Sequence, residues 1–148
     1  MSALAITRCT APSDEWDAFV RGQPHWTAYH LSAWQRVCAE VLGHDTIYLE
    51  ARNAGSSALQ GVLPLVRVKS RVFGHFLVSI PFVNYGGPLG SDEAIRSLVQ
   101  HATTMATRDG VDLLELRSRV ALPIDLAVSH RKVSVLLDLP DSVDLYDR

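Results

Sequence analysis

The sequence has few cysteines, little net charge and no long apolar run, and each shortage excludes a class of protein. Cys9 and Cys38 are the two cysteines among 148 residues, and they form no CxxC pair. We therefore expect free thiols in a reducing compartment rather than a disulfide framework. The formal net charge of −2 lacks the basic excess of a general DNA-binding or anionic-membrane-binding protein.

Targeting signals are also absent from the sequence. No apolar run approaches the roughly 18 residues that a membrane-spanning helix needs. The first six residues, MSALAI, lack the basic region and apolar core of a secretory signal. We therefore expect a cytoplasmic protein, with the inner face of the membrane as a second location.

Motifs for several kinds of chemistry are missing as well. There is no P-loop, no G-x-G-x-x-G, no G-x-S-x-G, and no pyrophosphate loop of the acyl-CoA transferases. His25, His30 and His44 lack the i, i+4 spacing of a helical zinc pair. Cys38 falls on an apolar helical stripe, so we expect it in the core rather than as a nucleophile.

What is present predicts one mixed α/β domain. Apolar residues make up 47% of the chain, which is typical of a soluble globular protein. The periodicities predict a strand-helix-helix-strand-strand-strand-helix-strand-strand order in an α+β mixed sheet. The expected strands are 4–7, 46–51, 59–69, 76–80, 113–117 and 133–139, and the expected helices follow Ser13, Ser32 and Ser91.

Individual residues mark the ends of these elements. Ser13 and Ser91 are expected N-caps, and Ser32 with Gln35 matches a capping box. Gly43 is expected to end the second helix. Pro64 cannot donate a ladder hydrogen bond, so its strand should meet an edge, a bulge or a splayed point there.

The stretch 79–90, SIPFVNYGGPLG, is the strongest candidate for a site. It follows an apolar strand and places Asn84 and Tyr85 before the flexible pair Gly86 and Gly87. Such a loop at the end of a strand is a plausible ligand-facing edge. A tight connection in which Tyr85 caps the core is the alternative.

Two basic features have two interpretations each. Arg67, Lys69, Arg71 and His75 surround a predicted hairpin turn, which is either simply solvated or an anion contact. Arg117 lies two residues after Glu115 on one strand face, so it either forms an ion pair with that carboxylate or binds a ligand.

Taken together, several short motifs resemble the Fem-like proteins of the GNAT acyltransferase superfamily. They are Trp16, YHLSAW at 29–34, GVLPL at 61–65, FG at 73–74, SIPFVNYGGP at 79–88 and LELR at 114–117. In particular they resemble the branch found near bacterial exosortase and exopolysaccharide genes. The motifs occur in the same order over nearly the whole chain.

The resemblance implies a GNAT-like acyl-CoA N-acyltransferase fold and a role in the cell envelope. Residues 1–140 would be an N-terminal module, and 141–148 the start of a connecting helix to a second GNAT-like module. Fem-type enzymes transfer an amino acid from aminoacyl-tRNA to an amine of a peptidoglycan precursor. This half would bind the precursor and no cofactor, and the acyl donor, aminoacyl-tRNA or acyl-CoA, would bind the other module.

The resemblance also implies which residues bind the substrate. They are Arg36, Asn84, Tyr85, the amides of Gly86 and Gly87, and Arg117. Related proteins usually carry Arg-Gly-Pro in the turn, whereas this chain has an uncharged, longer version. An amine on a sugar or lipid therefore fits as well as one on peptidoglycan.

We accordingly expect the substrate-binding half of an N-acyl or aminoacyl transferase, inactive by itself and with no identifiable base. Its partners would be the envelope precursor and the second module, with no DNA. One alternative is a non-enzymatic binding module that dimerises through an exposed sheet edge. Another is a stand-alone acetyl-CoA-dependent acetyltransferase, which the missing pyrophosphate loop disfavours.

Overall fold

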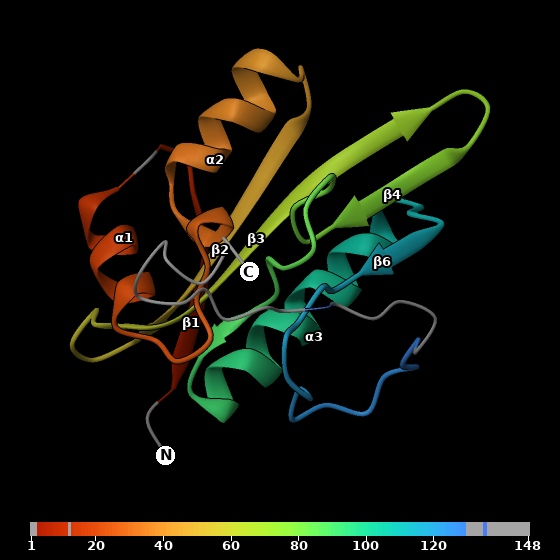
Figure 1. Cartoon of the computed structure of the whole chain (residues 1–148). Coiled ribbons are helices and arrows are strands. Elements are labelled where there is room, and N and C mark those ends of the chain that lie inside the picture. Colours follow the sequence, from red (N-terminus) through yellow and green to blue (C-terminus); the bar gives the residue numbers. More distant parts are fainter. Residues whose placement is uncertain (1–2, 12, 130–134, 136–148) are drawn as a thin grey trace, which may run out of the picture.

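The computed structural model describes residues 3–11, 13–129 and 135, and it shows a mixed sheet with helices on both faces (Figure 1). The strands are β1 (Leu4–Cys9), β2 (Asp45–Asn53), β3 (Leu59–Ser70), β4 (Gly74–Val78), β5 (Leu89–Gly90) and β6 (Leu113–Glu115). The helices are α1 (Asp14–Arg21), the 3₁₀ turn η1 (Ala28–His30), α2 (Ala33–Arg36), the π-helical η2 (Val37–Val41) and α3 (Asp92–Arg108). The predicted α+β mixed sheet is confirmed.

The sheet runs β1-β2-β3-β4-β6, and among the strands that the structure describes only the β4–β6 pair is parallel. β3 is the central strand, and it has two partners along one side. Its first half pairs with β5 at Gly61 and Val62, and its second half pairs with β4 from Val66 onward. Pro64 lies between these two pairings, so of the three predicted alternatives the structure shows the splayed point.

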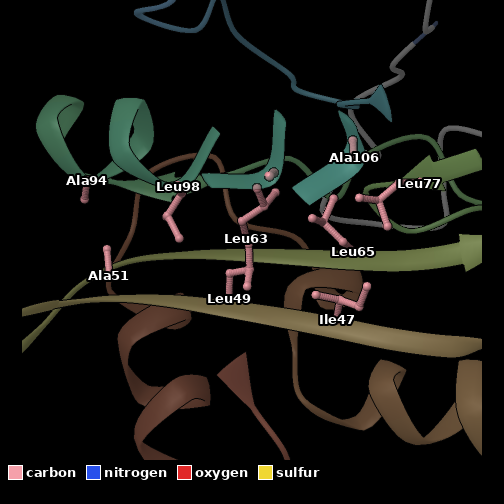
Figure 2. Packing of buried hydrophobic residues seen from close by; sticks show 10 residues of the cluster. Ile47, Leu49, Ala51, Leu63, Leu65, Leu77, Ala94, Leu98 and Ala106 are labelled. Atoms are coloured by element: carbon pink, nitrogen blue, oxygen red, sulfur yellow. The ribbon is translucent and has the colours of Figure 1, made fainter. Parts of the chain in front are cut away.

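One face of the sheet packs against α3 (Figure 2). Successive strand residues point to opposite faces, so Ile47, Leu49 and Ala51 all meet this helix layer. The helix contributes a stripe at helical spacing, formed by Ala94, Leu98, Ala102 and Ala106. Its small residues let the helix lie close to the sheet.

The other face is covered by α1 and by the α2–η2 segment. Trp16 and Val20 of α1 pack with Cys38 and with Tyr48 of β2. Tyr48 alternates with Ile47 and Leu49, so β2 is buried on both faces. Cys38 is fully buried, as predicted, and both cysteines are free.

Several helix ends follow the sequence prediction, and one does not. The Ser13 and Ser91 hydroxyls accept hydrogen bonds from the amides of Trp16 and Ala94, each at 3.3 Å. The capping box predicted at Ser32 is wrong. Ser32 has helical backbone angles, and its amide donates to the Asp17 carboxylate at 2.7 Å. The capping interaction occurs five residues earlier, between Thr27 and His30.

Three strand predictions also need correction, and one is that the strand predicted at 113–117 ends at Glu115. The strand predicted at 76–80 begins at Gly74 and ends at Val78, because Ser79 and Ile80 already belong to the following turn. β5 was not predicted, since two residues carry no periodicity. A Cβ on Gly90 would meet the Gln60 carbonyl oxygen, so only glycine allows this close pairing.

Some sequence predictions fall on residues outside the described part of the chain. The strand predicted at 133–139 is described only at Val135, and the segment 141–148 is not described. The same holds for the module boundary at 140. Along the residues that are described, no helix combines the length and apolar character needed to cross a membrane.

Candidate functional site

A strained turn follows β4 and forms the base of the candidate site. Ile80 and Phe82 have φ angles of 56° and 69°, a left-handed conformation that is unusual for a β-branched or bulky residue. Such a conformation persists only where neighbouring contacts fix it. Here the Ser79 amide donates to the Glu115 carbonyl oxygen at 2.9 Å, and the Ser79 hydroxyl accepts from the Arg117 amide at 2.7 Å.

The Arg117 side chain holds this turn from the other side. Its Nη1 donates to the Val83 carbonyl oxygen at 2.8 Å, and its Nε donates to Glu115 Oε1 at 2.9 Å. The ion pair considered from the sequence is therefore present. Because the guanidinium is engaged on two sides, Arg117 supports the turn while it also lines the neighbouring cleft.

The amides of Gly86 and Gly87 are occupied within the protein. Both donate to the Arg117 carbonyl oxygen, at 3.0 and 2.9 Å. In this conformation a substrate oxygen would have to displace the Arg117 carbonyl to accept from them, and the binding role expected for them stays a prediction. Gly86 is required for packing, because a Cβ there would lie 2.7 Å from Ile80 Cγ1.

His30 connects η1 to the same turn. Its Nδ1 accepts from the Thr27 amide at 3.0 Å, so its Nε2 carries the proton and donates to the Gly87 carbonyl oxygen at 3.1 Å. The His30 carbonyl in turn accepts from the Trp16 indole at 2.7 Å. Burial lowers the pKa of His30 below its ordinary value. His30 is therefore a neutral structural residue rather than a general base.

Next to this turn lies a cleft of about 180 Å³. Its walls are Gln23–His25 after α1, His30, the stretch from Tyr85 to the first turns of α3, and residues 117–123. The last wall is fixed to α3 because Arg96 Nε donates to the Pro123 carbonyl oxygen at 2.9 Å. His25, another wall residue, also has a left-handed φ of 64°.

The polar groups of the cleft include a phenol, a cation and a carboxylate. The Arg119 guanidinium lies 5.4 Å from the centroid of the Tyr85 ring, which is a cation–π distance. Asp92, in the first turn of α3, is exposed and lies 3.9 Å from Arg96. These groups can bind a ligand that carries both polar and apolar parts.

The structure brings only some of the predicted site residues together. Tyr85, Gly87 and Arg117 line the cleft, whereas Gly86 is buried beneath it. Asn84 is exposed and is not part of the cleft wall. Arg36 is also outside the wall, and its exposed side chain lies 3.5 Å from Glu40.

The sequence prediction missed His30, Asp92 and Arg119 as cleft residues. The available signal for His30 is its spacing from Thr27, which is that of a capping box. Arg119 follows Arg117 by two residues, which was the available signal. Among the described residues, no three His, Cys, Asp or Glu side chains gather closely enough to hold a metal ion.

The arrangement is suited to binding and orienting a ligand. Both ring nitrogens of His30 are hydrogen-bonded within the protein, so this histidine does not activate Ser118, the serine of the cleft wall. The remaining polar side chains can hold a substrate by charge and by stacking. His30 and Ser118 therefore do not form a paired base and nucleophile.

Comparison with known proteins gives likenesses among solved structures alone. No protein-family profile and no curated protein matches the chain. A solved structure described as "Crystal structure of FemX" has a TM-score of 0.49 and 20% sequence identity to it. The match covers 71% of this chain and 25% of that one, so the chain spans much less than the length of that protein. A likeness at this level bears on neither activity nor substrate.

Proposed function

We propose that this chain is the acceptor-binding part of an N-acyl or aminoacyl transferase acting on an amine of a cell-envelope precursor. The observation that carries the proposal is a cleft in which Arg119 contacts the Tyr85 ring. This cleft lies next to a strained turn that hydrogen bonds within the protein hold in place. The Fem-like motifs of the sequence support it, because the SIPFVNYGGP motif forms this turn and the LELR motif ends at its brace, Arg117.

In the proposed reaction the acceptor amine attacks the activated carbonyl of an acyl donor. The new C–N bond forms as the bond to the leaving oxygen or sulfur breaks, and the amine proton passes to the leaving group or to solvent. This chain contributes by orienting the acceptor, which lowers the entropic part of the barrier. The donor, an aminoacyl-tRNA or an acyl-CoA, would bind a second module.

The cleft chemistry suggests how the acceptor is held. Arg119 can contact an acceptor carboxylate or phosphate, and Tyr85 offers a ring face and a hydroxyl. Asp92 at the mouth can attract the acceptor ammonium before it loses its proton. Peptide and sugar amines both remain candidate acceptors, since the turn carries no arginine of its own.

The test is acceptor binding by calorimetry, with a peptidoglycan precursor peptide and an amino sugar as two probes. Tyr85→Ala and Arg119→Gln should each weaken binding of the accepted probe about tenfold, which corresponds to losing one aromatic or charge-assisted contact. Arg21→Gln, an exposed arginine outside the cleft, is the charge-matched control and should bind like the wild type.

Other outcomes would overturn the proposal. Binding of neither probe would remove its basis, and weakening by Arg36→Gln but not by Arg119→Gln would place the acceptor outside the cleft. A rise in melting temperature with acetyl-CoA would instead favour a stand-alone acetyltransferase. Concentration-dependent dimerisation without any ligand binding would favour an assembly module.

A further inference from the structure

The β3–β4 hairpin carries an exposed apolar tip that the proposed function does not use. Arg71, Val72 and Phe73 connect the two strands. The exposed fractions of Val72 and Phe73 are 83% and 77%, although both are large apolar residues. Figure 1 shows the hairpin extending away from the helices, with this connection at its far end. Nothing in the described core needs these two side chains.

The backbone of the tip is internally hydrogen-bonded. The Ser70 hydroxyl accepts from the amides of Val72 and Phe73, at 3.2 and 3.1 Å. The amide of His75, two residues after Phe73, donates to Asp112 Oδ2 at 2.7 Å. An unpaired amide is costly to remove from water. Because the amides of Val72, Phe73 and His75 are already paired, the tip can enter a less polar medium without that cost for these three groups.

Two cations come shortly before the apolar pair in the chain. Lys69 and Arg71 are exposed, and neither forms an ion pair with any residue that the structure describes. Arg67, which lies on the same strand but farther from the tip, is instead neutralised by Asp109 at 2.6 Å and Asp45 at 3.3 Å. The positive charge is thus concentrated beside Val72 and Phe73.

This pattern matches the interface of an anionic bilayer. Apolar side chains bind at the boundary of headgroups and acyl chains, while neighbouring lysine and arginine side chains contact lipid phosphates. The chain as a whole has a net charge of −2, so its remaining surface is not attracted to such a membrane. Two apolar side chains also offer far less area than the roughly 800 Å² per partner of a stable protein interface.

We propose that the hairpin tip 69–73 is a docking element for an anionic lipid surface. Val72 and Phe73 insert at the headgroup boundary, and Lys69 and Arg71 contact the lipid phosphates. One apolar and one electrostatic contribution together give weak, reversible attachment. This inference does not depend on the identity of the acceptor.

The experiment is co-sedimentation of the chain with vesicles of equal parts phosphatidylcholine and phosphatidylglycerol, against vesicles of phosphatidylcholine alone. The wild type should bind the mixed vesicles, and added salt should release it. The double variants V72S/F73S and K69Q/R71Q should each lower the partition coefficient about tenfold. Because all four side chains are exposed, the melting temperatures of both double variants should stay near that of the wild type.

The matched control is V41S/R21Q, which removes an exposed valine and an exposed arginine from another part of the surface. It should bind the mixed vesicles like the wild type. The proposal is wrong if this control loses as much binding as the tip variants, or if both vesicle types bind equally. It is also wrong if the wild type binds no vesicles but self-associates, and the tip variants abolish that self-association. The tip would then be a contact between protein chains.

Discussion

Single residues fix the geometry of the cleft. Gly86 passes close to Ile80, and its amide pairs with the Arg117 carbonyl. His30 holds the next carbonyl, that of Gly87, through its Nε2 proton. These contacts join three segments that are far apart in the sequence. Their loss should therefore affect stability as well as binding.

Gly86→Ala should destabilise the fold by about 1–3 kcal/mol, because the new methyl group overpacks the turn. Its Cβ would lie 2.7 Å from Ile80 Cγ1 and 2.9 Å from the Ser79 carbonyl oxygen. Gly55→Ala is the control, since the nearest atom to its Cβ would be Asn53 Oδ1 at 3.5 Å. Urea denaturation measures both, and equal midpoints for the two variants would contradict the prediction.

His30 should make stability depend on pH near neutrality. Its folded-state pKa lies below the ordinary value of 6.5, so below that pH the unfolded state binds more protons. The free energy of unfolding is therefore highest above about pH 7 and should fall toward about pH 5. The lowered carboxylate pKa values of Glu15 and Asp109 act only at lower pH.

His30→Gln removes the titrating ring and keeps a donor for Gly87. It should cost about 1–2 kcal/mol at pH 7.5, because the Thr27 amide loses its acceptor. The variant should also show a flatter dependence of unfolding free energy on pH between about 5 and 7. Parallel curves for wild type and variant in urea titrations would show that another group titrates.

At the scale of elements, α3 anchors both the core and the cleft. Its apolar stripe packs on the sheet, and its first turns form one cleft wall through Asp92 and Ile95.

The α2–η2 segment is less regular, since the Leu42 amide bonds to the Val37 carbonyl five residues back. A π-helical turn of this kind was not evident from the apolar stripe, which fits either helix type.

Leu98→Ala should lower the free energy of unfolding by about 2–5 kcal/mol. Leu98 is fully buried between α3 and the sheet, so its truncation leaves a cavity beside Leu63 and Ala51 (Figure 2). Gln100→Ala on the exposed side of the same helix is the control and should stay within about 0.5 kcal/mol of the wild type. Similar losses from both substitutions would contradict the prediction, because alanine is a better helix former than either residue and only lost packing at Leu98 should be costly.

At the scale of the whole molecule, one charge cluster ties the hairpin to the end of α3. Arg67 of β3 contacts Asp109, the residue that caps α3, and Asp45 of β2. Arg67 Nη1 also lies 3.2 Å from His75 Nε2 on β4. The hydrogen bonds from Arg108 and then Arg67 lower the pKa of Asp109 to about 2.

Asp109→Asn should lower the melting temperature at neutral pH. The pKa of Asp109 in the folded state, about 2, lies below the ordinary value of 3.8. The carboxylate therefore stabilises the fold in full above pH 3.8, and this stabilisation is lost as the pH falls toward 2. The gap between wild type and variant should therefore close in acid. Asp125→Asn, an exposed carboxylate without an ion pair among the described residues, is the control for thermal melts. A gap that stays constant down to about pH 2 would contradict this account.

Local patterns were enough to predict most of the elements and part of the site. The caps at Ser13 and Ser91 and the break at Pro64 depend on short-range hydrogen-bonding chemistry that a sequence displays directly. The error at Ser32 has a tertiary cause, because Asp17 takes the Ser32 amide and the chain caps at Thr27 instead. Tyr85 was found from its loop, and Arg119 beside it was not.

The sequence by itself determined the α+β class, the buried stripes and the position of the glycine turn, since periodicity and backbone permissiveness are local properties. Only the tertiary structure decided what that turn does. The amides of Gly86 and Gly87 looked available for a ligand, yet the carbonyl of Arg117, some thirty residues later, occupies them. A hydrogen-bonding group is free or satisfied according to its neighbours in space, and no local pattern records those neighbours.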